Sequence, residues 1–238
     1  MATIHTDWKS AIKGYEDYLA LERGLSENSI LAYIRDIKQF AKIIEEVDNV
    51  TNPSKINLSN VEHFLANLYD KGIARNSQAR KLSGVRSFCK FLRIEGVIET
   101  NPIELIEGPR AQRKLPDVLT VNEIDRIIAS VDMSRREGVR NKSMLEVLYS
   151  CGLRVSELTS LQMSRVDLVD GVVKVLGKGN KERIIPIGRQ ACDSIDDYLS
   201  HYRSGIIPLA GHEDTMFLGR QGRKMTRQMA FPMLKRSV

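Results

Sequence analysis

The chain has 238 residues, of which 42% are hydrophobic and 28% are charged. This balance excludes a disordered chain and supplies enough apolar side chains for one large domain or two ordinary ones. The formal net charge is +6, which suits a polyanionic partner. Residues 1–108 contain 14 basic and 15 acidic side chains, whereas residues 109–238 contain 22 and 15, so the positive surplus lies in the second half.

Cysteine and histidine usage argues against a metal site. Cys89, Cys151 and Cys192 are widely spaced without a Cys-x-x-Cys pair, and the four histidines are scattered. An odd number of thiols favours a reducing compartment over a disulfide scaffold. The first residues lack the apolar segment of a signal peptide, and no apolar run reaches the length of a membrane span. We therefore expect a cytoplasmic protein with no metal site and no membrane partner.

The first hundred residues have apolar side chains spaced by three and four, which predicts helices. One helix is indicated from Trp8 to Leu19 and a second from Ile30 to Ile44, after a possible cap at Ser26. Ser59-Asn60-Val61-Glu62 has the form of a capping box for a third helix, which should stop at Gly72. Together with a fourth helix, these elements predict a compact helical domain over residues 1–108.

The fourth helix, expected from about Ser77, has an apolar face and a basic one. Leu82, Val85, Cys89 and Leu92 form the apolar face. The segment from Arg75 to Arg93 contains six basic residues and no acidic one. A charged face can be merely solvated, but helices that need only solubility usually mix signs, so a face of one sign favours phosphate contact. The candidate phosphate contacts on this helix are Arg75, Asn76, Ser77, Arg80, Lys81, Arg86 and Lys90.

A segment between Gly108 and Thr120 has two prolines, several charges and no apolar rhythm, which indicates a linker at residues 109–119. A second domain is then expected over residues 120–238. Its first helix should open at Asn122-Glu123-Ile124, and a further helix should end at Cys151. Two β-branched runs, Val172–Leu176 and Arg183–Ile187, flank a Gly-Lys-Gly-Asn turn and predict a hairpin. Helical spacing returns around Ile195, so the fold class is mostly α with one small β-sheet.

The stretch CGLRVSELTSL places Arg154 directly after a glycine, at the start of a segment with helical spacing. Cationic side chains are disfavoured near a helix N-terminus, because the macrodipole is positive there. Arg154 could be an ordinary surface residue in a helix–turn–helix corner. Alternatively, Arg154 and the helix end could both face an anion.

Two further segments combine basic residues with a turn or a helix start. GKGNKER lacks the spacing of a nucleotide-binding loop, so its lysines could simply keep the turn soluble. However, Lys178 stands at a glycine-flanked tip, from which it could reach into a groove or act as a general acid. Near the end of the chain, Thr226 is a plausible helix N-cap beside basic residues, either in an exposed loop or in a phosphate clasp. The candidate phosphate contacts there are Arg223, Lys224, Thr226 and Arg227.

These motifs together resemble a known family. LEVLYSCGLRVSELTSL, followed at the right interval by VVKVLGKGNKERIIPIG, resembles the tyrosine recombinases of the phage integrase family, and more narrowly their XerC/XerD-type branch. The early stretch YLALERGLSENSILAYIRDIKQF and the junction from NPIELIEGPR to LPDVLT are similar to the same family. The resemblance implies an N-terminal helical, SAM-like core-binding domain that contacts DNA. It also implies an α+β catalytic domain in the second half.

The resemblance implies a mechanism as well. In such enzymes a tyrosine attacks the scissile phosphate and forms a 3′-phosphotyrosyl link, without metal or nucleotide cofactor. Arg154 would hold the non-bridging phosphate oxygens, and Lys178 would protonate the leaving 5′-oxygen. The two domains would close around duplex DNA as a clamp. A second recombinase protomer would join in a homo- or heterotetramer on the DNA.

The sequence departs from the family pattern in its later motifs. None of the four histidines begins a His-x-x-Arg motif, and the last of the seven tyrosines is Tyr202, before the region where the nucleophile is expected. We therefore expect a catalytic domain that is incomplete at its C-terminal end, which binds DNA but does not cleave it alone. Two alternatives remain open: a non-catalytic DNA-binding or architectural protein on the same scaffold, and a helical interaction protein whose basic faces meet an acidic protein.

Overall fold

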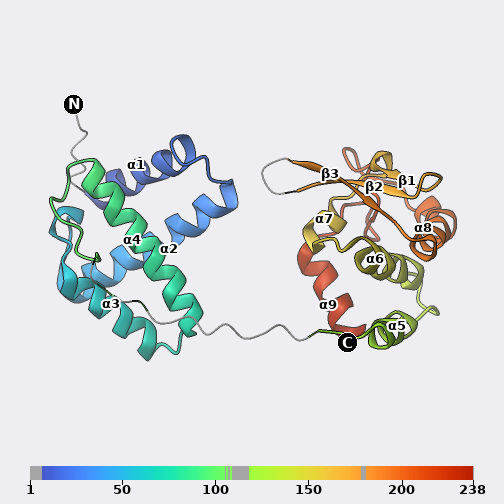
Figure 1. Cartoon of the computed structure of the whole chain (residues 1–238), viewed down its shortest axis with the longest axis horizontal. Coiled ribbons are helices and arrows are strands. Elements are labelled where there is room, and N and C mark those ends of the chain that lie inside the picture. Colours follow the sequence, from blue (N-terminus) through green and yellow to red (C-terminus); the bar gives the residue numbers. More distant parts are fainter. Residues whose placement is uncertain (1–6, 105, 107, 109–117, 178–180, 238) are drawn as a thin grey trace. The chain divides into compact units, whose positions relative to one another are not determined.

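The computed structural model describes residues 7–104, 106, 108, 118–177 and 181–237, with side chains described as far as Pro232. The chain divides into two units, Met1–Leu115 and Pro116–Val238, each with its own hydrophobic core (Figure 1). Most of the expected linker, residues 109–117, lies outside the described residues. No helix in the described part of the chain is both long and apolar enough to cross a membrane.

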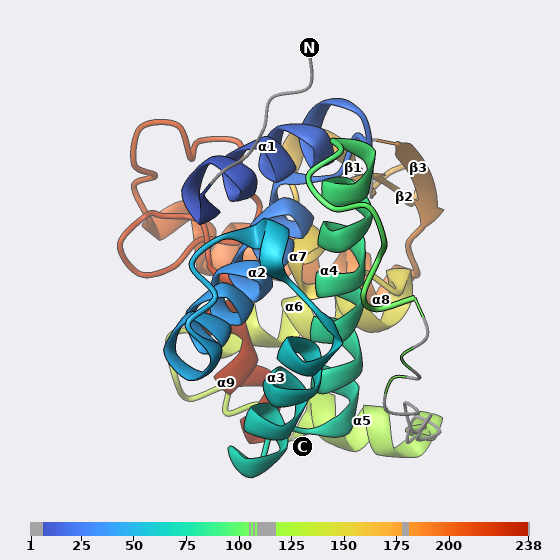
Figure 2. The ribbon, with the colours of Figure 1, turned by 90° about the vertical axis from the view of Figure 1, so that its left-hand side faces the viewer.

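The first unit consists of the four helices that the sequence predicts, joined by short loops. They are α1 (Trp8–Leu21), α2 (Glu27–Asp48), α3 (Leu58–Asp70) and α4 (Arg75–Ile94), with a 3-10 turn η1 (Pro53–Lys55) before α3. Helix α4 packs across α2, while α1 lies towards one end of this pair and α3 towards the other (Figures 1 and 2). The predicted four-helix arrangement is confirmed, although α4 begins two residues earlier than expected.

The starts of these helices show how well capping could be predicted. Ser26 is the N-cap residue of α2, as expected. The capping box predicted at Ser59–Glu62 is wrong, because α3 begins earlier. Asn57 accepts a hydrogen bond from the backbone N of Asn60 at 3.2 Å, and the Asn60 side chain accepts one from the backbone N of Asn57 at 2.9 Å. Asparagine caps a helix as well as serine does, so both sites fitted the local pattern.

Aromatic rings fill the core of the first unit. The indole ring of Trp8 stacks on Phe88, with ring centroids 6.0 Å apart, and its Nε1 donates a hydrogen bond to the carbonyl oxygen of Val50 at 3.0 Å. The whole predicted apolar face of α4, from Leu82 to Leu92, is buried against these rings. Burial also raises the pKa of the Cys89 thiol to about 12, so this cysteine is an unreactive core residue.

A buried carboxylate lies between α2 and α4. The side chain of Asp36 is only 2% exposed, and both of its oxygens accept hydrogen bonds from the guanidinium of Arg80. Lys81, whose side chain is 13% exposed, lies 3.3 Å from the same carboxylate and also bonds Gln39. A buried charge is tolerated only when it is paired and hydrogen-bonded, so Asp36 fixes the contact between α2 and α4.

The second unit combines helices with one small sheet (Figure 1). Its helices are α5 (Val121–Ala129), α6 (Gly138–Cys151), α7 (Val155–Thr159), α8 (Arg189–His201) and α9 (Arg227–Ser237), with 3-10 turns η2 (Met163–Arg165) and η3 (Arg203–Gly205). Its strands are β1 (Val166–Asp167), β2 (Val172–Leu176) and β3 (Glu182–Pro186), antiparallel in the order β1-β2-β3. The predicted hairpin is confirmed, with its second strand shifted by one residue, whereas the two-residue β1 is too short to give a sequence signal.

Tyr198 organises the core of the second unit. It is wholly buried on α8, which packs against α6. Its hydroxyl donates a hydrogen bond to the carbonyl oxygen of Met216 at 3.0 Å and accepts one from the backbone N of Leu218 at 3.1 Å. These two bonds hold the segment before α9 against α8, so Tyr198 is a structural residue.

The pairing of Asp36 yields a stability prediction. Asp36→Asn should destabilise the first unit by about 2–4 kcal/mol, because it leaves the part-buried Lys81 ammonium without its counter-charge. Trp8 is the single tryptophan in the chain, so urea unfolding followed by tryptophan fluorescence reports this unit alone. As a control, Asp17→Asn removes an exposed partner of Lys13 and should cost less than about 1 kcal/mol. Equal effects of the two substitutions would contradict the role given to Asp36.

Candidate functional site

Arg154 lies in the corner between α6 and α7, as the sequence predicts. Helix α6 ends at Cys151, and Gly152 adopts the left-handed conformation with φ of 57°, which favours glycine. Leu153 is buried and anchors the corner, and Arg154 follows with extended backbone as the N-cap residue of α7. The Arg154 side chain is 70% exposed. The chain therefore changes direction at Gly152 and presents a guanidinium to solvent.

Arg154 is paired with an anion of the chain itself, the carboxylate of Glu157. The Glu157 carboxylate is only 6% exposed, and its Oε2 accepts a hydrogen bond from the backbone N of Arg154 at 2.8 Å. Its Oε1 accepts a second bond from Nη1 of Arg154 at 2.9 Å. The backbone N–H of the N-cap residue Arg154 is thus already bonded within the chain. Glu157 stands three residues after the N-cap, and this capping-box spacing could have identified it from the sequence.

A second arginine completes the cluster from another element. Arg183 on β3 donates from Nη1 to Oε1 of Glu157 at 3.0 Å and from Nη2 to Oε2 at 2.9 Å. This two-pronged geometry is the strong form of an arginine–carboxylate pair. The three side chains that form what we call the Glu157 cluster are therefore Arg154, Glu157 and Arg183.

Charge in the Glu157 cluster is unevenly distributed. Hydrogen bonds from Arg183, and to a lesser extent from Arg154, lower the pKa of Glu157 to about 2, although burial acts in the opposite direction. The same pairing raises the pKa of Arg183. At neutral pH the cluster consists of two guanidinium groups around one carboxylate and has a surplus of one positive charge. That surplus is most exposed at Arg154 and is suited to an oxyanion.

The Glu157 cluster also contacts the base of the β2–β3 turn. The backbone N of Gly177 donates to the carbonyl oxygen of Lys181 at 2.8 Å, which closes the turn. A Cβ atom at Gly177 would lie 3.0 Å from Nη1 of Arg183, so this guanidinium packs over the start of the turn. Lys178, the candidate acid, is in the same turn but lies outside the described residues.

The basic cluster near the end of the chain sits on a turn that glycine makes possible. The backbone N of Gly219 donates to the carbonyl oxygen of Arg223 at 2.8 Å. Gly222 has φ of 70°, and a Cβ atom there would lie 2.1 Å from the carbonyl oxygen of Ile207, so no other residue fits. Arg223 and Lys224 are exposed on this turn.

Helix α9 begins directly after this turn. The predicted N-cap at Thr226 is confirmed, because its hydroxyl accepts a hydrogen bond from the backbone N of Met229 at 3.2 Å. Arg227 lines an open pocket together with Val155, Gln228 and Phe231. Helix α7 packs against α9 (Figure 1), and the pocket adjoins the α6–α7 corner, because Val155 directly follows Arg154.

The basic face of α4 carries less free charge than its sequence indicates. Arg80 and Lys81 are both paired with the buried Asp36, and Nη2 of Arg86 donates to the carbonyl oxygen of Ile106 at 2.9 Å. Arg75 and Lys90 are exposed, and no described residue forms an ion pair with either of them. Asn76 is also exposed, whereas Ser77 is half-buried in the first turn. The neutralising carboxylate comes from α2, which the sequence of α4 alone could not reveal.

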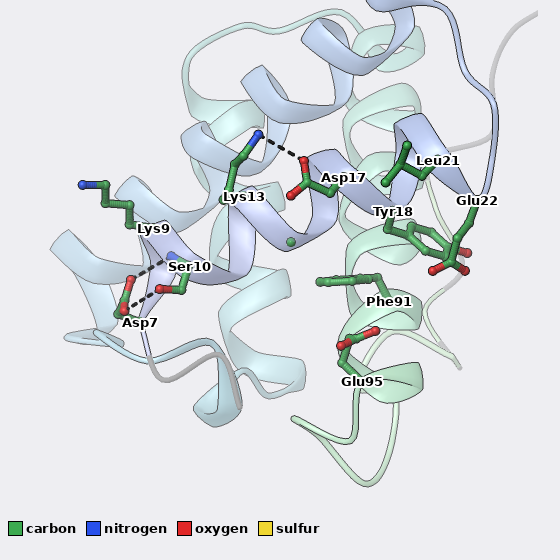
Figure 3. Close-up of a pocket in the computed structure, with 11 residues that line it drawn as sticks. Asp7, Lys9, Ser10, Lys13, Asp17, Tyr18, Leu21, Glu22, Phe91 and Glu95 are labelled. Carbon is green, nitrogen blue, oxygen red and sulfur yellow. Dashed lines mark hydrogen bonds and ion pairs between the residues drawn. The ribbon is translucent and has the colours of Figure 1, made fainter. Parts of the chain in front are cut away.

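An open pocket on the first unit has a different character (Figure 3). It runs along α1 to the end of α4, with Tyr18 next to Phe91 and Glu95. Lys13, at its rim, is paired with Asp17 at 3.1 Å. Both acidic and basic side chains line it, so this pocket does not offer the single positive sign that a nucleic-acid backbone requires.

The described residues contain no group of three or more histidine, cysteine, aspartate or glutamate side chains that could hold a metal ion.

Comparison with known proteins assigns the two units. Residues 117–238 match the model of the phage integrase family, and residues 12–96 match that of the phage integrase N-terminal SAM-like domain. The chain belongs to the phage integrase family, the tyrosine recombinases. The resemblance seen in the two motifs around Arg154 and the β2–β3 turn is thereby confirmed, as is the predicted pairing of a SAM-like domain with a catalytic-type α+β domain.

Several similar proteins are XerD recombinases. The chain is 39% identical over 225 residues to tyrosine recombinase XerD of Oceanobacillus iheyensis, covering 94% of this chain and 75% of that protein. It is 37% identical over 227 residues to XerD of Staphylococcus haemolyticus, covering 95% and 76%.

Solved structures share the fold at low sequence identity. A lambda integrase dimer bound to a COC′ core site has a TM-score of 0.72 at 18% identity, covering 97% of this chain and 77% of that one. A lambda integrase tetramer bound to a Holliday junction has a TM-score of 0.73 at 18% identity, covering 99% and 64%. These similarities concern the fold.

The lowered pKa of Glu157 yields a pH prediction. An acid whose pKa is depressed in the folded state stabilises the protein above its ordinary pKa near 4.5 and loses this contribution as the pH falls through about 2. Glu157→Gln should therefore lower the free energy of unfolding of the second unit by up to about 3 kcal/mol at pH 7. The difference in the free energy of unfolding between this variant and wild type should shrink as the pH falls from 4.5 to 2. Urea unfolding followed by far-UV circular dichroism measures it.

Two controls accompany this measurement. The unfolding transition of the first unit, followed by Trp8 fluorescence, should be the same in both proteins. Glu182→Gln breaks an exposed pair with Arg165 on the same sheet and should cost less than about 1 kcal/mol at every pH. The free energy of unfolding of wild type should exceed that of Glu157→Gln by an amount that depends on pH. If this difference did not change with pH, Glu157 would not be an ionised carboxylate paired with two arginines.

Proposed function

We propose that this chain acts in site-specific DNA recombination: it binds duplex DNA and holds the scissile phosphate with Arg154. The observation that carries the proposal is the Glu157 cluster, in which an exposed arginine is fixed at its base by a buried carboxylate and remains positively charged overall. Family membership supplies the reaction class.

Arg154 suits a phosphodiester because of its donor geometry. Nη1 bonds Glu157, and no described residue accepts a hydrogen bond from Nε or Nη2 of Arg154. The planar guanidinium can therefore give two parallel bonds to the non-bridging oxygens of one phosphate. It stays charged at any physiological pH, so it would also stabilise the charge that builds on those oxygens in a transition state.

Lys178 is proposed as the general acid that protonates the leaving 5′-oxygen. The support for this role is the family resemblance and the position of this residue in the β2–β3 turn. The packing of Arg183 over Gly177 links the start of that turn to the residue that fixes Arg154. A single cluster would thus orient the phosphate ligand and support the base of the turn that carries the acid.

The remaining candidate contacts would bind the DNA backbone. In the second unit these are Arg223 and Lys224 on the exposed turn, with Thr226 and Arg227 at the start of α9. On α4 we propose Arg75, Asn76, Ser77, Arg80, Lys81, Arg86 and Lys90. Because Asp36 compensates Arg80 and Lys81, the exposed Arg75 and Lys90 should contribute more to affinity. In this proposal residues 1–108 form the core-binding domain, 109–119 the linker and 120–238 the catalytic domain.

We further propose that the chain as given does not cleave DNA by itself. It has no His-x-x-Arg motif, and two tyrosines of the second unit, Tyr198 and Tyr202, are buried. The remaining tyrosine of that unit, Tyr149, is 46% exposed on α6. Catalytic groups that act as a unit lose most of their effect when one member is missing. The proposed partners are duplex DNA and further recombinase protomers, as in the lambda integrase tetramer.

The alternative is a DNA-binding or architectural protein that performs no chemistry on the same scaffold. Such a protein needs a basic surface, but it does not need one arginine fixed by a buried carboxylate. The geometry of Arg154 and Glu157 therefore favours a recombinase site.

Duplex binding tests the proposed role of Arg154. The logarithm of the association constant should fall linearly with the logarithm of salt concentration, because each neutralised phosphate releases counterions. Arg154→Ala should reduce the slope by about 0.9, the value for one phosphate of B-form DNA. Fluorescence anisotropy with a labelled duplex at several salt concentrations measures this slope.

Arg135 provides a matched control for Arg154. It is also exposed and also pairs with a carboxylate three residues away, that of Asp132 at 2.9 Å. Arg135→Ala should leave the slope unchanged. Binding that is insensitive to salt would contradict both DNA-binding proposals and favour an acidic protein partner instead.

A nicked suicide duplex tests whether the chain cleaves DNA. We expect no protein–DNA adduct that survives denaturant, because the His-x-x-Arg motif and the expected nucleophile are absent from this sequence. The measurement is a denaturing gel with end-labelled DNA. Formation of an adduct would refute the proposed inactivity, and Tyr149→Phe would then show whether the exposed tyrosine of α6 had attacked the phosphate.

A further inference from the structure

We propose that Arg183 is a positioning residue: it occupies the Glu157 carboxylate, and thereby leaves Arg154 free to bind a phosphate. The inference rests on the proposed phosphate-binding role of Arg154. Arg183 on β3 is not among the candidate site residues that the sequence predicts.

The hydrogen bonds divide the carboxylate unequally between the two arginines. Arg183 places one guanidinium nitrogen on each oxygen of Glu157, at 3.0 and 2.9 Å. Arg154 uses only Nη1 of its side chain, at 2.9 Å, together with its backbone N. Arg183 therefore takes the two-pronged position, and Arg154 keeps its other edge turned away from the carboxylate.

Exposure follows the same division. The Arg183 side chain is 39% exposed, whereas that of Arg154 is 70% exposed. Arg183 also packs over Gly177, which limits its reach toward a ligand. Arg183 is thus positioned to pair with the Glu157 carboxylate, and Arg154 is positioned to bind an anion from outside the chain.

Removal of Arg183 would change the state of Arg154. Glu157 is buried, and its negative charge would then have Arg154 as its only cationic partner among the described residues. The two-pronged geometry is the stronger one, so the Arg154 guanidinium would turn onto both carboxylate oxygens. The cluster would become neutral, and the donors that a phosphate requires would be used internally. A lysine at position 183 would retain the positive charge but not the two-pronged guanidinium geometry. It would therefore only partly replace Arg183 as the partner of Glu157.

The test uses the salt dependence of duplex binding by the full chain. Arg183→Met should reduce the slope by about 0.9, as Arg154→Ala does, although Arg183 itself contacts no phosphate. The double variant Arg183→Met/Glu157→Gln should recover the wild-type slope, because no charged carboxylate then captures Arg154. Arg183→Lys should give an intermediate slope. Circular dichroism at the temperature of measurement verifies that each variant is folded.

The rescue separates the possible roles of Arg183. If Arg183 contacted a phosphate directly, the salt-dependence slope of the double variant would remain below the wild-type slope by about 0.9. That result would overturn the inference. A purely structural role would also leave the double variant unrescued, with a lowered unfolding midpoint. If Arg183→Met does not fold, the other two variants still test the inference. A wild-type slope for Arg183→Lys would contradict it. A reduced slope for the double variant would contradict it as well.

The same data distinguish failure of this inference from failure of the proposed function. If Arg154→Ala lowers the slope but Arg183→Met does not, the positioning role alone is wrong. If Arg154→Ala has no effect, the phosphate-binding role of Arg154 fails, and the positioning role fails with it. Arg165→Met, which removes the ion-pair partner that the turn η2 contributes to Glu182 on β3, is the matched control and should retain the wild-type slope.

Discussion

The second unit depends on one buried carboxylate held by two arginines. Glu157 receives four hydrogen bonds, two from Arg154 and two from Arg183, and these tie the α6–α7 corner to strand β3. A carboxylate removed from water requires such partners, because an unpaired buried charge is strongly unfavourable. The pairing therefore fixes the backbone on which Arg154 stands. Since there are two cations for one anion, the cluster also keeps a surplus positive charge, which is most exposed at the Arg154 side chain.

The first unit uses the same kind of pairing with the opposite result. Asp36 is as deeply buried as Glu157 and also faces two cations, Arg80 and Lys81. There, however, the Lys81 side chain is itself largely buried, and Arg80 spans both oxygens of the carboxylate. The charges are used to hold α2 against α4. Whether a basic residue can serve a ligand thus depends on how much of its guanidinium or ammonium remains outside the internal pair.

Local patterns in the sequence predicted what depends on neighbours in the chain. Helical spacing located the helices of both units, the Gly-Lys-Gly-Asn turn located the hairpin, and Gly152 followed by Arg154 located the corner. Features that depend on distant partners were missed. Asp36 neutralises α4 from another helix, and Arg183 reaches Glu157 only because of the register of β3. The capping box of α3 failed for a different reason, since asparagine and serine satisfy the same local rule.

Membership of the tyrosine recombinases and the geometry around Arg154 bear on different steps of a reaction. Holding a phosphate requires a charged donor with its edge free, and the Glu157 cluster provides this from residues 154–183 alone. Breaking the phosphodiester requires, in addition, a nucleophile and the histidine–arginine motif, and this sequence has no His-x-x-Arg. The internal carboxylate is satisfied without those groups, so the arrangement of Arg154 does not depend on them. In the proposed function, phosphate binding by Arg154 is therefore physically separable from strand cleavage, because Arg154 stands on a corner and beside a hairpin that fold around their own counter-ion.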